Sequence, residues 1–224
     1  MFELGFSTYA MKMLDPYLAV KIISESNYKY VEICIADEWP TTPSKFDKKN
    51  QKKLLKVIND YGLISNHTFG FLDICNSSKK NLDQIKMKFE MANEINNSST
   101  SPIITSTLGK SAPSWETGKK FISKSLSQIG EVASEFDVIL AIEPHAGTDF
   151  ESPEKAHWLI DDVNHKNISI DLDLSHFIVE GHDMEKSIQM CADIASVLHI
   201  KDGYKVNDKI HYCLTGDGQI EVDK

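Results

Sequence analysis

Arginine is absent from this 224-residue sequence, in which all 24 basic residues are lysine and the formal net charge is −9. Surfaces that bind nucleic acid are generally basic, and arginine gives them bidentate contacts to phosphate and guanine. We therefore expect no nucleic-acid partner. The lysine clusters at 48–49 and 52–53 are interpreted as the solvated face of a helix.

Long apolar runs and paired cysteines are also lacking. No run approaches the roughly 20 residues that span a bilayer, and residues 1–7 lack the basic and apolar regions of a signal peptide. The four cysteines are widely spaced, so neither a thiolate zinc site nor a disulfide framework is predicted. We expect a cytoplasmic protein without membrane contact, and the sequence leaves open whether it forms a homo-oligomer.

Short apolar runs alternate with amphipathic stretches along the chain. The runs begin near residues 4, 30, 63, 102, 138, 168 and 196. This alternation is typical of strand–helix units with a parallel sheet. No Gly-x-Gly-x-x-Gly follows the first run, so a dinucleotide-binding sheet lacks its signature. The sequence predicts one α/β domain, 1–224, a (β/α)₈ TIM barrel with seven βα units visible and the last unit missing from its C-terminal end.

The stretches between the runs carry helix signals. Asp15 and Pro16 form a typical helix start, with an N-cap residue followed by proline at the first helical position. The third strand is expected to end at His67, and 203–224 is expected to hold turns without a further long element. Helices are predicted over about 16–23, 47–61, 81–96, 115–136, 152–160 and 184–194.

Acid and imidazole side chains follow three of the apolar runs. Glu143 closes 138–142, Asp173 closes 168–172 with His176 close behind, and His199 ends 195–198. The carboxyl ends of parallel strands meet on one face of a barrel, where ligands bind. Carboxylates and neutral imidazoles gathered there suit a divalent metal.

Four motifs carry a resemblance to a known family over essentially the whole chain. They are Ile142-Glu143-Pro144-His145, Asp173-Leu174-Ser175-His176 with Gly181, His199-Ile200-Lys201-Asp202, and the segment 216–220. In their order and spacing they resemble the xylose isomerase-like TIM barrel superfamily. That superfamily includes sugar phosphate isomerases and epimerases, ketose 3-epimerases, hydroxypyruvate isomerases, inosose dehydratases and endonuclease IV.

The resemblance implies a metal site. Carried over from ketose 3-epimerase-like members, the ligands are Glu143, Asp173 and His199, whereas the fourth, a glutamate on strand eight, has no counterpart in this sequence. Asp173 is preferred to Asp171, which lies two residues earlier on the same strand face. His176 would bind substrate oxygens, although its equivalent in the endonucleases ligates zinc.

The implied function is a divalent-metal-dependent sugar or sugar phosphate isomerase or epimerase. Proton abstraction next to a carbonyl would pass through a metal-stabilised enediolate, with Glu143 as the catalytic base and its partner on the missing strand. Mn²⁺, Mg²⁺ or Co²⁺ would suit the ligands, and Zn²⁺ is possible. The alternatives are an endonuclease IV-like zinc phosphodiesterase and a catalytically inactive sugar-binding barrel.

Further residues are weighed against structural roles. His67, His145 and Lys201 are candidate substrate-binding residues, and Lys205 is a weaker one that is expected to be solvated. Glu32 is interpreted as a structural or supporting residue. The structural alternative for Glu143 is a helix cap or an ion-pair partner, and for His199 it is a satisfied buried histidine. Four histidines are expected on the surface: His157, His165, His182 and His211.

Overall fold

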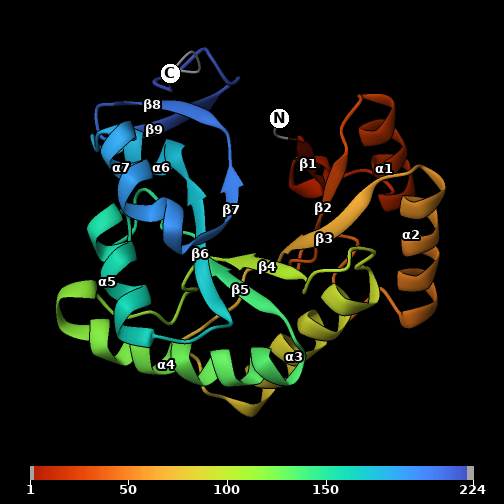
Figure 1. Ribbon diagram of the computed structural model, residues 1–224, viewed down its shortest axis with the longest axis horizontal. Coiled ribbons are helices and arrows are strands. Elements are labelled where there is room, and N and C mark those ends of the chain that lie inside the picture. The colour runs from red at the N-terminus through yellow and green to blue at the C-terminus, as the bar shows by residue number, and fades with distance from the viewer. Residues whose placement is uncertain (1–2, 221–224) are drawn as a thin grey trace.

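The computed structural model describes residues 3–220, and its main sheet consists of parallel strands in chain order. Each strand pairs with the next one along the chain. Figure 1 shows the sheet curving into an open barrel, with β1 and β7 at its two ends. The predicted barrel with seven βα units is therefore confirmed. The strands are β1 (Gly5–Ser7), β2 (Tyr30–Cys34), β3 (Ile64–Phe69), β4 (Ile103–Ser106), β5 (Ile139–Ile142), β6 (Ile168–Asp173) and β7 (Ala195–His199).

The longer helices lie on the outside of the curved sheet (Figure 1). Their apolar faces and the outer faces of the strands bury one continuous core. Side-chain caps begin most of them: Asp15 accepts from the N–H groups of Tyr17 and Leu18, and Asp47 caps the next helix. The helices are α1 (Pro16–Glu25), α2 (Lys48–Asp60), α3 (Lys79–Glu94), α4 (Trp115–Glu135), α5 (Pro153–Val163), α6 (Leu174–Val179) and α7 (Met184–Cys191).

All six predicted helices are present, although the last one ends at Cys191 and continues as a 3-10 turn at Ala192–Ile194. Two further features lie between the helices and the strands. A 3-10 turn at Thr8–Met11 follows β1, and α6 follows β6 directly because the Asp173 side chain caps the N–H of Ser175. None of the helices within residues 3–220 has the length and hydropathy needed to cross a membrane.

Two expectations about the strands are wrong. β3 extends to Phe69, so His67 lies within the strand and not at its end. The strand continues through polar residues because His67 finds partners inside the barrel, in Glu32 and Thr105.

The tail is the second error, because residues 202–213 form an antiparallel hairpin of β8 (Asp202–Val206) and β9 (Lys209–Cys213) where only turns were expected. Residues 221–224 of that prediction lie outside the described part of the chain. Asn207 and Asp208 form its two-residue loop, both with positive φ, as a hairpin turn of this length requires.

The segment 216–220 folds around the buried carboxylate of Asp202. A Cβ atom on Gly218 would lie 2.2 Å from Asp202 Oδ1, so the close approach requires glycine there. This arrangement fixes the chain immediately after Lys201. The carboxylate accepts hydrogen bonds from the backbone N–H groups of Gly203, Gly216, Gly218, Gln219 and Ile220.

Candidate active site

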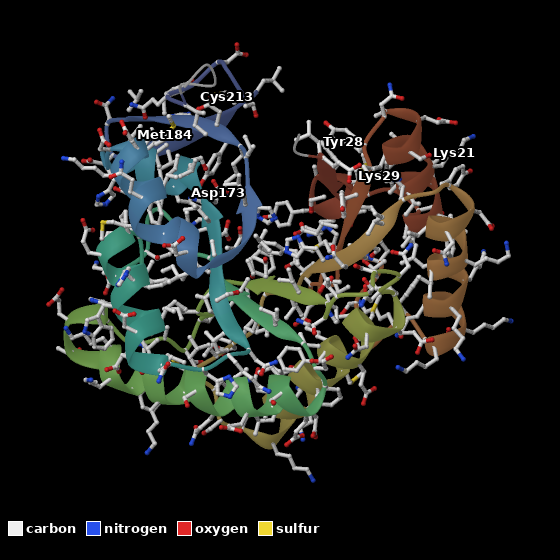
Figure 2. All side chains as sticks on the ribbon, viewed as in Figure 1. Lys21, Tyr28, Lys29, Asp173, Met184 and Cys213 are labelled. Atoms are coloured by element: carbon white, nitrogen blue, oxygen red, sulfur yellow. The ribbon has the colours of Figure 1, made fainter. Side chains whose placement is uncertain are left out.

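The three predicted metal ligands meet at the carboxyl ends of neighbouring strands. Glu143 directly follows β5, Asp173 ends β6 and His199 ends β7. One ligand atom from each lies within 4.8 Å of the others. Glu143 and Asp173 are buried, and Figure 2 labels Asp173 at the end of β6, beside β7. Side chains 56 residues apart in the sequence therefore share one small space, since Glu143 and His199 belong to the same group.

A second group links β7 to β2 and β3 across the barrel. Glu32 Oε2 lies 3.0 Å from His67 Nδ1 and 3.0 Å from His199 Nε2, and the Ser7 hydroxyl donates to Oε1. Burial alone would raise the pKa of Glu32, but the two histidines lower it to about 2. Burial lowers the pKa of His67 to about 4. Glu32 is therefore a carboxylate at neutral pH, and His67 is a neutral imidazole.

Asp171 lies against the other side of His199, with its Oδ2 2.8 Å from His199 Nδ1. Burial would lower the pKa of His199, but Glu32 and Asp171 raise it to about 11. Burial raises the pKa of Asp171 to about 6. A carboxylate on the second ring nitrogen is the usual way to orient a metal-binding histidine. Asp171, which the sequence left as an alternative ligand, has the geometry of that supporting role.

Lys201 lies among the acidic residues of the site. Its Nζ is 2.8 Å from Asp173 Oδ2, 3.5 Å from Glu143 Oε1 and 2.9 Å from His176 Nε2. His176 Nε2 is also 3.2 Å from Glu143 Oε1. Burial would raise the pKa of Glu143, but the hydrogen bond from His176 and the charge of Lys201 lower it to about 2. Burial would lower the pKa of Lys201, and the two carboxylates raise it instead.

Two further side chains complete this part of the site. The rings of His145 and His176 are 3.9 Å apart between centroids, and burial lowers the pKa of His145. Tyr212 Oη on β9 lies 3.4 Å from His176 Nδ1. The sequence analysis missed Tyr212 because it predicted no strand in the tail. The turn-forming pair Asn207 and Asp208, followed by alternating polar and apolar residues in 209–213, could have revealed the hairpin.

The donor set fits a divalent cation. Two carboxylates and one imidazole give the mixed oxygen and nitrogen ligands that Mn²⁺, Mg²⁺, Co²⁺ and Zn²⁺ accept. Asp173 Oδ2 and both Asp171 oxygens are buried without a well-oriented hydrogen bond. Buried carboxylate oxygens in this state need a cation nearby. His199 and Lys201 supply that positive charge in this structure.

Comparison of the sequence with models of known protein families agrees with the barrel seen in the structure. A family profile described as "Xylose isomerase-like TIM barrel" matches residues 20–223. The chain belongs to this family. No protein of curated function matches the sequence at a significant level.

Several solved structures have a fold similar to that of this chain, although their sequence identity to it is low. The probable 3-DHS dehydratase of petrobactin synthesis from Bacillus anthracis has a TM-score of 0.77 and 18% identity, over 91% of this chain and 74% of that one. The 3-keto-D-glucoside 4-epimerase of E. coli has a TM-score of 0.71 and 18% identity, over 90% of this chain and 80% of that one. D-psicose 3-epimerase from Clostridium cellulolyticum H10 has a TM-score of 0.70 and 12% identity, over 88% and 72%. At these identities the likeness shows the shared barrel fold.

The other weighed residues lie away from this group. His157 pairs with Asp161 on α5, and His165 lies 3.6 Å from Glu131 on α4. Lys205 pairs with Glu180. Glu32 does belong to the site: it contacts two of the candidate histidines, which agrees with the supporting role that the sequence assigned to it.

Proposed function

We propose that this chain is a divalent-metal-dependent isomerase or epimerase of a sugar or sugar phosphate, acting by proton abstraction next to a carbonyl. The observation that carries the proposal is the convergence of Glu143, Asp173 and His199 within 4.8 Å at the barrel rim. Active sites of TIM barrels are built at this face. The similar epimerase structures support the same class of chemistry.

Each residue of the site would have a separate role in this reaction. Glu143, Asp173 and His199 would hold the metal, which when bound polarises substrate oxygens and stabilises developing negative charge. Glu143 Oε1 would accept the substrate proton, since this carboxylate is ionised at neutral pH and lines the adjoining cavity. His176 Nε2, 3.2 Å from that oxygen, would orient it. Lys201 Nζ would donate to a substrate oxygen.

A cavity beside the site gives the substrate a place to bind. It has a volume of about 460 Å³ and is lined by Glu143 and His145 together with Trp115 and Phe150. This volume falls within the range of small-molecule sites, and aromatic walls exclude water from the reacting atoms.

A dehydratase is the second candidate, because two imidazoles lie beside Glu143. Loss of a hydroxyl group next to the abstracted proton begins with the same step, and His145 or His176 could protonate the departing oxygen. The similarity to the probable 3-DHS dehydratase supports this variant. A zinc phosphodiesterase has less support, since the net charge of −9 disfavours a nucleic-acid substrate.

Proton exchange in D₂O tests the proposed function directly. The protein is incubated with Mn²⁺ and a panel of ketoses, aldoses and their phosphates, and proton NMR follows the hydrogen next to the carbonyl. We expect deuterium to enter at that carbon for at least one sugar and chelation to stop it. A new sugar isomer identifies an isomerase or epimerase, and a conjugated carbonyl identifies a dehydratase. No exchange with any metal or sugar would contradict both.

Lys201→Met is expected to strengthen metal binding about tenfold while reducing turnover. The ammonium lies 2.8 Å from Asp173 and 3.5 Å from Glu143, so it competes with a cation for the same carboxylates. Calorimetric titration with Mn²⁺ measures the affinity. Lys205→Met is the matched control, because this lysine pairs with Glu180 instead. Equal Mn²⁺ affinities in the two variants would show that Lys201 does not share the metal site.

A further inference from the structure

A second and larger cavity, of about 810 Å³, opens on the same rim, beyond the ends of β1 to β4. Phe71, Thr107 and Gly109 line both this cavity and the smaller one at Glu143, so the two adjoin. Together they exceed the range of about 300–1,000 Å³ of ordinary small-molecule sites. The proposed reaction at Glu143 makes no use of the larger cavity.

Three aromatic rings form one wall of this cavity, and we call Tyr9, Trp39 and Phe71 the aromatic platform. Tyr9 and Trp39 stack with centroids 5.0 Å apart, and Phe71 lies 6.1 Å from Tyr9. Phe69 connects the platform to the candidate metal site, since its ring is 4.8 Å from Phe71 and 6.4 Å from His199. A ligand on the platform would therefore reach toward the reacting atoms.

The backbone is built to present Phe71 to the cavity. Phe71 has φ 44°, in the left-handed region that a non-glycine residue rarely adopts, and its side chain is 41% exposed. Lys88, which is 5% exposed, donates to the carbonyl oxygens of Gly70 at 2.7 Å and Phe71 at 3.4 Å. A buried ammonium that holds a strained turn, with an apolar ring exposed at its tip, is typical of a binding site.

The charges around the cavity are balanced, and this favours a neutral ligand. Lys88 pairs with Asp37 at 3.1 Å, and Lys12 pairs with Glu38. Asp73 accepts from the Ser111 backbone N–H and hydroxyl at 2.8 and 2.7 Å. Lys80 and Lys110 also line the cavity, and the neutral polar side chains on its walls include Asn76, Asn81, Gln84 and Thr107.

Aromatic faces beside amides and hydroxyls are suited to a polyhydroxylated ring. The carbon–hydrogen face of a sugar packs on an aromatic ring, while its hydroxyl groups take up hydrogen bonds at the edge. The wall carries three acidic and three basic side chains, so a charged ligand gains no net attraction from it.

We propose that the larger cavity binds the second ring of a neutral two-ring carbohydrate, whose first ring occupies the cavity at Glu143. This assignment deepens the proposed function and names its substrate class as a disaccharide or similar glycoside. The reacting ring lies beside Glu143 and His145, and the other ring stacks on the aromatic platform.

Sugar binding without turnover tests the assignment. The full chain, treated with EDTA, is titrated by NMR with maltose, cellobiose and sucrose and with glucose and fructose. We expect at least one disaccharide to bind about tenfold more tightly than either monosaccharide. Tyr9→Ala should remove that advantage, whereas Tyr61→Ala, at an equally exposed tyrosine on the outer surface, should preserve it. Phe71→Ala and Phe121→Ala form a second matched pair of exposed phenylalanines.

The outcomes separate this assignment from the proposed reaction. Disaccharides that bind no more tightly than monosaccharides, or an advantage that survives both Tyr9→Ala and Phe71→Ala, would overturn the second-ring site. Because the titration contains no metal, its result is independent of proton exchange, which tests the reaction alone. Proton exchange with monosaccharides and no disaccharide advantage would leave the enzyme proposal intact and reject the two-ring substrate.

Discussion

Glu143→Gln is expected to lower kcat/KM by about 10³-fold and to weaken Mn²⁺ binding by about 100-fold or more. Glutamine keeps the size of the side chain but loses the negative charge and the oxygen that would accept the substrate proton. The loss falls on a buried carboxylate whose Oε1 lies 3.2 Å from His176 Nε2 and 3.5 Å from Lys201 Nζ. Elemental analysis after dialysis measures the bound metal, and proton exchange in D₂O measures the reaction.

The control for this prediction is Glu131→Gln, at an exposed glutamate on α4. It should retain both the metal and the exchange reaction. A Glu143→Gln protein that is folded by circular dichroism and binds as much metal as the unmodified chain would contradict the ligand assignment. A protein that loses the metal and still exchanges the substrate proton would instead contradict the assignment of Glu143 as the base.

Asp202→Ala is expected to lower the free energy of unfolding by roughly 3 kcal/mol. The change removes the acceptor of five backbone N–H groups, and some of these donors stay too enclosed to be fully hydrated. Burial would raise the pKa of Asp202, but these hydrogen bonds lower it. A lowered pKa means that the stabilisation is complete above the ordinary pKa of about 3.9 and is lost as the pH falls through the folded-state value.

Urea denaturation at pH 7 and at pH 3 measures this effect. Asp217→Ala is the control, because Asp217 is an exposed residue of the same segment and leaves the carboxylate of Asp202 in place. We expect a large difference between the two variants at pH 7 and a smaller one at pH 3. Hydrogen exchange at Gly218 and Gln219 should become faster only in Asp202→Ala. If Asp202→Ala and Asp217→Ala had equal urea midpoints at pH 7, the prediction would be contradicted, because water would then hydrate the freed N–H groups without loss of stability.

The fold could be predicted because buried parallel strands leave a simple signal in the sequence. Runs such as 138–142 are apolar on both faces, and each is followed by an amphipathic helix with a recognisable cap, as at Ser152 and Pro153. The candidate ligands could be predicted for the same reason, since Glu143, Asp173 and His199 each follow such a run.

The rest depended on contacts between strands that a single sequence does not encode locally. Glu32 lies in the middle of an otherwise apolar strand. Pairing with β3 places it beside His67, and the curvature of the sheet brings it to His199. Tyr212 reaches His176 because the chain turns back through the 202–213 hairpin. The raised pKa of His199 follows from these contacts and could not be read from its neighbours along the chain.

The curved sheet has a practical consequence for work with this protein. Within residues 3–220, β1 and β7 are edge strands, each paired on one side only. Leu4, Leu198 and Ile200 are exposed beside these edges. Free edges with apolar side chains recruit further strands, so self-association should grow with protein concentration. Dilution series therefore belong in every measurement of affinity or stability on this chain.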